Sequence, residues 1–211
     1  MFIVGIDLSG PSNTADTSLV VFRANGERLK LQQSLPGAGD GAIYDIVADL
    51  CSQDAVAIGI DAPLSYNPGG GDRPCDSDLR CIQAGMRPGS VMAPIMTRMA
   101  YLTLRGIYVA RSLRLIQEAP PRIVEVHPGA TMALRGAPIY AVKTFKQDAE
   151  SRQNLLQWLA QQGLGAIANT TPSDHDVAAC AAALTAWKWC TEETVWLHRA
   201  TPPFHAFDYD Y

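Results

Sequence analysis

Long apolar runs are absent from this chain of 211 residues, and no stretch approaches the roughly 20 apolar residues that cross a bilayer. We therefore expect no membrane contact. The N-terminus has no basic segment and Asp7 interrupts its apolar stretch, so a signal peptide is not expected. Cys-x-x-Cys pairs are also absent. The five cysteines are an odd number, which favours reduced thiols in a cytoplasmic protein over a disulfide framework.

Lysine is missing from the middle of the chain, between Asp72 and Arg122, although arginine is frequent there. The formal net charge of -4 argues against general nucleic-acid binding. However, arginine without lysine suits bidentate contacts with phosphate or carboxylate groups. A solvated helix face is the alternative interpretation. The candidate substrate-binding residues in this region are Arg73, Arg80, Arg87 and Arg98.

Two dense apolar runs each end on an aspartate, Asp7 near the N-terminus and Asp61 in the segment 58–64. Runs of this kind are typical of buried central strands. The carboxyl ends of such strands are where open α/β sheets collect ligands. Each aspartate could instead end its strand with an Asx-turn. If the two strands are neighbours, the two carboxylates repel each other unless a proton or a cation lies between them, and magnesium or manganese suits such oxygen ligands.

The hydrophobic pattern predicts one α/β domain over residues 1–211, with a mixed sheet covered on both faces. Asn25 and Gly26 predict a hairpin between the second and third strands. Residues 65–94, rich in Gly, Pro and Asp, predict a lid or binding loop inserted after the fourth strand. The expected strands are 2–8, 18–24, 27–35, 55–60 and 122–126, with 192–198 as a short addition, and the expected helices are 43–50, 95–116, 146–161 and 174–189.

Acidic residues also occur at the start of the last predicted helix, where Asp174 and Asp176 follow Ser173. Ser173 and Asp176 have the spacing of a capping box in acidic form, and both aspartates favour the positive end of a helix. A helix that begins at the strand tips would also deliver a third metal ligand. Both interpretations of Asp174 and Asp176 stay open.

Two further patterns could carry chemistry. Glu125 and His127 are two residues apart on the fifth predicted strand and so share a face. They are either a mutually satisfied buried pair or a ligand and a proton carrier beside Asp61. On the long predicted helix, a basic-aromatic stripe either stacks bases or packs beneath a loop. Its members are Arg98, Tyr101, Arg105 and Tyr108.

Six segments occur in order along nearly the whole chain: GIDLSG at 5–10, IDAPL at 60–64, DRPCD at 72–76, MAP at 92–94 with Thr97 and Arg98, EVHP at 125–128, and DHD at 174–176 leading into ALTA at 183–186. Together they resemble domain of unknown function 429 (DUF429), a family usually described as predicted nucleases with an RNase H-like fold.

This resemblance implies a five-stranded sheet of order 3-2-1-4-5, acids at the tips of strands one and four, and a third acid from the last helix. Holliday-junction resolvases share that layout and cut phosphodiesters with two divalent ions. One position departs from the pattern. An aspartate-alanine pair is expected one turn into the last helix, but the chain has Ala178 and Ala179 there. Asp174 or Asp176 would have to substitute.

We therefore expect a nuclease with magnesium or manganese held by Asp7, Asp61 and Asp174 or Asp176, and nucleic acid as its partner. Ala178 and the net charge favour one alternative, an inactive RNase H-like protein that binds nucleic acid or another ligand. Phosphotransfer or other metal-dependent hydrolysis is a second alternative. It rests on the likeness of 5–10, followed by Thr17 and Ser18, to the first phosphate loop of actin-like ATPases and sugar kinases. Those proteins use two lobes, so this chain would have to dimerise.

Overall fold

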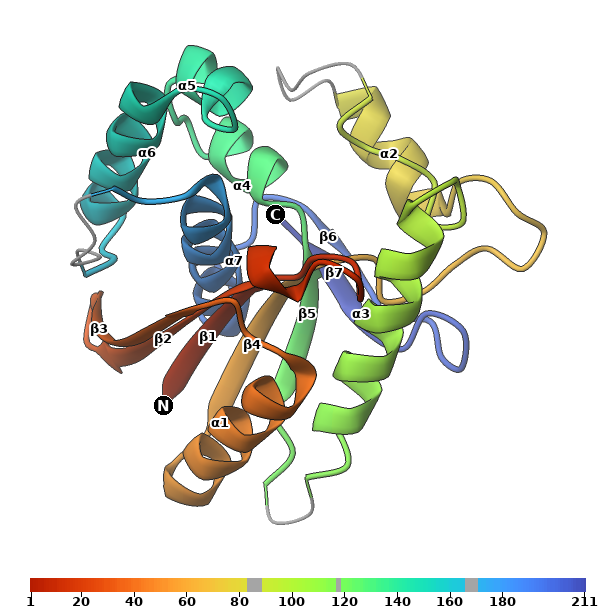
Figure 1. Cartoon of the computed structure of the whole chain (residues 1–211), viewed down its shortest axis with the longest axis horizontal. Coiled ribbons are helices and arrows are strands. Elements are labelled where there is room, and N and C mark those ends of the chain that lie inside the picture. The colour runs from red at the N-terminus through yellow and green to blue at the C-terminus, as the bar shows by residue number, and fades with distance from the viewer. Residues whose placement is uncertain (83–88, 117–118, 166–170) are drawn as a thin grey trace.

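A mixed sheet of seven strands forms the centre of the computed structural model, which describes residues 1–82, 89–116, 119–165 and 171–211 (Figure 1). Its order is β3-β2-β1-β4-β5-β7-β6. β1 pairs antiparallel with β2 and parallel with β4, and β4 pairs parallel with β5. The strands are β1 (Phe2–Asp7), β2 (Ser18–Asn25), β3 (Arg28–Pro36), β4 (Val56–Asp61), β5 (Arg122–Val126), β6 (Leu197–His198) and β7 (Asp208–Asp210).

The prediction of five strands is wrong, although the order 3-2-1-4-5 holds for the first five. β7 adds to β5 in parallel, and the two-residue β6 closes that edge antiparallel to β7. Both strands are too short to show an alternating pattern. They are stabilised by aromatic side chains instead: the Trp196 ring stacks on Tyr211 at 4.5 Å between centroids and meets Tyr209 edge-on.

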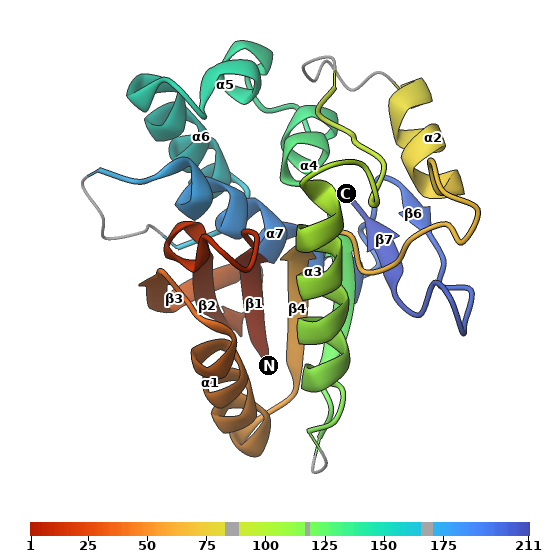
Figure 2. The same ribbon diagram turned by 45° about the vertical axis from the view of Figure 1, so that its right-hand side comes forward.

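Helices cover both faces of the sheet (Figures 1 and 2). Helices α4 to α7 pack on one face, and α1 and α3 pack on the other. α2, α4 and α5 were not predicted. Among the described residues, no helix is both long and apolar enough to span a membrane. The helices are η1 (Thr14–Asp16), α1 (Asp40–Gln53), α2 (Pro74–Ile82), α3 (Met99–Leu113), α4 (Pro128–Leu134), α5 (Ile139–Thr144), α6 (Ala149–Gln161) and α7 (Asp174–Cys190).

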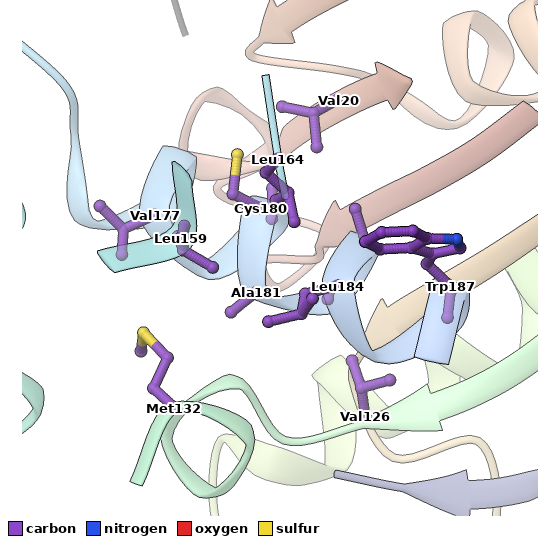
Figure 3. Packing of buried hydrophobic residues seen from close by; sticks show 14 of the residues in the cluster. Val20, Val126, Met132, Leu159, Leu164, Val177, Cys180, Ala181, Leu184 and Trp187 are labelled. Atoms are coloured by element: carbon purple, nitrogen blue, oxygen red, sulfur yellow. The ribbon is translucent and has the colours of Figure 1, made fainter. Parts of the chain in front are cut away.

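Helix α7 approaches the sheet closely because small residues meet along their contact. Gly5 and Gly59 are paired in the register of β1 and β4. A Cβ atom at Gly5 would lie 1.9 Å from the carbonyl oxygen of Ala179, and one at Gly59 would lie 2.2 Å from that of Ala182. The rest of α7 belongs to a buried cluster that also includes Met132 of α4, Leu159 of α6 and residues of the sheet (Figure 3). This contact fixes the start of α7 beside the carboxyl ends of β1 and β4.

Gly5→Ala is expected to lower the free energy of unfolding by about 3 kcal/mol, the upper end of the range for overpacked cores, because the added methyl group overlaps backbone rather than a movable side chain. Thermal unfolding should shift down by roughly 6–12 °C for a chain of this size. Gly41→Ala, in α1 with open space around the new methyl group, is the matched control and should be neutral or slightly stabilising. Equal melting temperatures for the two variants would contradict the close contact.

Candidate active site

Asp7 and Asp61 lie directly opposite each other at the ends of the parallel strands β1 and β4. The predicted adjacency of these two residues is therefore confirmed. Both side chains line a cavity of about 400 Å³ at this edge of the sheet. The Asp7 side chain is 13% exposed, so the carboxylate reaches the cavity while most of its surface is covered.

The surroundings of Asp61 favour the protonated form of its carboxyl group. Desolvation, the negative charge of Asp7 and a hydrogen bond to Asp7 raise the pKa of Asp61 well above its usual value. The positive charge of Lys146 opposes this shift only partly. In its protonated form Asp61 can donate this hydrogen bond to Asp7, and the negative charge of Asp7 favours that form.

His175, in the first turn of α7, is the second partner of Asp7: its Nδ1 lies 2.6 Å from Asp7 Oδ2. This hydrogen bond is the main cause of the raised pKa of His175, and Asp174 and Asp16 add to it. Sequence reasoning placed His175 in an acidic cluster but assigned it no role. Its position one residue into a helix aimed at the strand tips was the available signal.

The structure separates the two aspartates of the α7 start. Asp176 is buried and forms the capping box with Ser173, and its Oδ1 accepts a hydrogen bond from the Ser18 hydroxyl at 2.8 Å. It does not line the cavity, whereas Asp174 does. Ala178, one turn further along, lines the cavity too. The methyl group of Ala178 therefore occupies the side of α7 where the family resemblance implies a carboxylate.

Glu125 takes part in a buried ion-pair network rather than facing Asp61 alone. Arg73 Nη2 lies 2.6 Å from Glu125 Oε1 and 2.8 Å from Asp76 Oδ1. Glu125 Oε2 also accepts hydrogen bonds from Arg73 Nη1 and from the Leu64 backbone. With Nε bonded to Asp76 and Nη1 also bonded to Ser65, all five N–H groups of Arg73 are used. This placement leaves Arg73 no donor for a phosphate.

His127 caps α4 instead of pairing with Glu125. Its Nδ1 accepts a hydrogen bond from the Ala130 backbone at 3.1 Å, and its Nε2 lies 3.2 Å from the carbonyl oxygen of Ser90. The carbonyl can only accept, so the ring is the neutral tautomer with hydrogen on Nε2. Burial lowers the pKa of His127, in agreement with a neutral ring. Both ring nitrogens are therefore occupied in this structure.

The cavity lining includes two lysines that the sequence did not single out, Lys143 in α5 and Lys146 just after it. Both are exposed and line the cavity. The segment inserted after β4 covers another side, with Val91 and Met92 among its lining residues. Described residues of the insertion therefore line the cavity at the carboxylate edge; its role as a lid stays a prediction.

Among the described residues, Arg80 and Arg98 do not line this cavity. Arg80 is partly exposed and bonds Asp72 and the Val91 carbonyl. Arg98 is exposed at the N-cap of α3. Arg87 lies outside the described residues. The substrate contacts of all three stay predictions.

Within residues 1–82, 89–116, 119–165 and 171–211, no three His, Cys, Asp or Glu side chains gather in an arrangement that could hold a metal ion. Asp7 and Asp61 form a pair, with Asp174 on the wall beside them. The chemistry of this donor set fits one hard cation, because two adjacent carboxylates repel each other and a cation between them offsets that repulsion.

A protein-family model described as "Protein of unknown function (DUF429)" matches residues 5–202. That range includes every candidate site residue named above. No curated protein matches the chain.

Proposed function

Because the chain belongs to the DUF429 family, whose function is unknown, we propose its activity from the site: hydrolysis of phosphodiesters in nucleic acid, dependent on a divalent cation. The order β3-β2-β1-β4-β5, with β2 antiparallel to β1, supports an RNase H-like fold as part of this proposal.

The observation that carries the proposal is the in-register carboxylate pair on the cavity floor. Two like charges side by side at a partly exposed site are costly, and the raised pKa of Asp61 reflects that cost. A purely structural site has little reason to bring two aspartates together on neighbouring strand ends. A divalent cation would replace the proton and let both groups ionise.

Asp7 and Asp61 would hold this cation, magnesium or manganese, and Asp174, which lines the same cavity, would add negative charge to the site. When bound, the cation supplies Lewis-acid activation of the phosphate and of an attacking water. Ala178 removes the carboxylate that would complete a second cation site, so we propose one cation rather than two.

The chain's own residues perform the remaining tasks. Lys143 and Lys146 add positive charge to the wall facing the carboxylates and would attract the phosphate. His175 fixes the orientation of the Asp7 carboxylate through its 2.6 Å hydrogen bond. The Arg73 network holds the inserted segment against β5 and so keeps the cavity shaped.

Asp7→Asn tests this function. The variant keeps the shape of the side chain but removes an anion that the cation needs, so cation-dependent cleavage should fall at least about 100-fold, the loss typical of weakened metal ligation. At a manganese concentration about 100 times the Kd, wild-type protein should gain about 2.7 kcal/mol of stability, or roughly 5–10 °C. The variant should gain little of this. Cleavage of single-stranded, duplex and branched substrates is measured beside thermal melts with and without manganese.

Asp45→Asn, an exposed aspartate on α1, is the matched control and should behave like wild type. The proposal fails if manganese does not change the melting temperature of wild-type protein and no substrate is cleaved.

The second candidate, an inactive binding protein, is favoured by Ala178. The variant Ala178→Asp separates the two candidates, because its carboxylate would enter the cavity one turn from Asp174. If the protein is an active one-cation enzyme, wild type already cleaves nucleic acid. If it lost its activity when alanine replaced the aspartate, only the Ala178→Asp variant cleaves.

A further inference from the structure

The outward face of α3 presents an apolar and aromatic surface that nothing covers in the described chain. Tyr101, Leu104 and Tyr108 are 64%, 64% and 62% exposed. Their spacing of three and four residues puts them on one side of the helix. The opposite side, with Val109 and Leu113, is buried against the sheet and α1. Exposures near two-thirds mean that these three side chains have little packing role within the monomer.

The predicted stripe needs one correction, because Arg105 is not part of this surface. It is only 4% exposed, and its guanidinium bonds Asp40, the Ser9 carbonyl and the Thr17 hydroxyl. Its charge is thus used inside the fold. The exposed face therefore consists of Tyr101, Leu104 and Tyr108.

Arginines mark both ends of this face. Arg98 at the N-cap and Arg111 in the last turn are exposed. No acidic residue occurs in the sequence between Asp78 and Glu118. Among the described residues, the one acidic residue that bonds to α3, Asp40 of α1, is paired with Arg105. The segment that forms the α3 face thus contributes arginines and no acidic residue in a chain whose formal net charge is -4, which fits an anionic partner.

The face begins beside the cavity and leads away from it. Met99 and Leu102, in the first turn of the same helix, line the cavity. From Tyr101 to Tyr108 the helix advances about 10.5 Å, since each residue adds about 1.5 Å. Stacked nucleotides in one strand are about 3.4 Å apart, so this length matches about three nucleotides.

We propose that the α3 face binds single-stranded nucleic acid, with Tyr101 and Tyr108 stacking on bases and Arg98 and Arg111 contacting phosphates. The further claim that the bound strand leads into the cavity rests on the proposed function. The strand is single because bases already stacked within a duplex do not expose their faces to a protein ring. We choose nucleic acid over protein because the face combines exposed aromatic rings with arginines, and its own segment contains no acidic residue.

The test measures binding of a short fluorescent oligothymidine by anisotropy in EDTA, where no cation-dependent cleavage occurs. The double variant Tyr101→Ala/Tyr108→Ala should weaken binding about ten-fold or more. Tyr101→Phe/Tyr108→Phe should bind like wild type, because stacking needs the ring and not the hydroxyl. Arg98→Gln/Arg111→Gln should reduce the slope of log affinity against log salt by about 1.4, or 0.7 for each lost phosphate contact.

Tyr140→Ala, on α5 and 74% exposed, is the matched control and should not change the affinity. Equal binding by wild type and the double alanine variant, or no binding by wild type, overturns the proposal. It is also overturned if wild type is a dimer that the double alanine variant disrupts without an effect on oligonucleotide affinity, since the face is then a contact between two copies. If wild type binds the oligonucleotide through the two tyrosines but cleaves no substrate, the proposed α3 binding face is supported and only the proposed hydrolysis is contradicted.

Discussion

Asp61→Asn is expected to abolish cation-dependent cleavage and, in neutral buffer without metal, to unfold at a higher temperature than wild type. The amide of asparagine can donate to Asp7 the hydrogen bond that protonated Asp61 donates. It does so without ever ionising, so the repulsion between the two carboxylates disappears. The same change removes a cation ligand, and manganese should no longer stabilise the protein.

The raised pKa of Asp61 also predicts how the stability of the folded protein changes with pH. Asp61 has a raised pKa in the folded protein, so between the unfolded pKa of about 3.9 and the folded pKa the folded state binds more protons. The Asp61 contribution to stability is therefore present at low pH and is lost as pH rises through that window. Melting temperatures of both proteins across acid to neutral pH measure the effect. The melting temperature of wild type should fall relative to that of Asp61→Asn as pH rises. A difference in melting temperature that does not change with pH would contradict the raised pKa of Asp61.

Arg73→Ala is expected to cost about 3–5 kcal/mol of folding free energy, the range for removing one partner of a buried ion pair. Arg73 and Glu125 are 2% and 5% exposed, and Asp76 is also 2% exposed. Burial alone would lower the pKa of Arg73, but the adjacent carboxylates outweigh it and raise the pKa, so the guanidinium stays charged. Its removal leaves two carboxylates buried without a counter-charge.

Chemical denaturation measures this loss, and the melting temperature should fall by roughly 6–20 °C. Arg80→Ala is the matched control: Arg80 also pairs with an aspartate, Asp72, but their side chains are 38% and 34% exposed. Exposed pairs contribute about 0–1 kcal/mol, so its effect should be small. Similar losses for the two variants would show that the buried network contributes no more than a surface pair.

The sequence predicted those parts of the fold whose signals are local. The apolar runs of β1 and β4 are buried on both sides, and the Asn25–Gly26 signal produced the β2–β3 hairpin. The short strand expected at 192–198 is present only as β6, at the end of that range. β7 could not be predicted because it depends on contacts between aromatic residues distant in sequence, such as Trp196 and Tyr211. α2 was missed because its helical signal is short and lies in a segment rich in Gly and Pro.

For the candidate site, too, local signals could be predicted from the sequence and contacts between distant residues could not. Asp7 and Asp61 could be predicted because parallel strands end at one edge, and the register pairs them. The pairing of Arg73 with Glu125 could not, because the two residues are 52 positions apart and only the folded insertion brings them together. Lys146 gave no signal either, since its place at the cavity depends on how α5 packs after β5.

The glycine contacts beneath α7 have a consequence for how this site can vary. Since the helix and the strands meet backbone to backbone at Gly5 and Gly59, their separation is set by atoms that every residue possesses. The distance from His175 to Asp7 therefore depends on positions that contact neither residue. A larger side chain at Ala179 or Ala183 would lift the helix and draw the imidazole away from the carboxylate. Sequence changes confined to the interior could thus retune the chemistry of the cavity while leaving each of its lining residues in place.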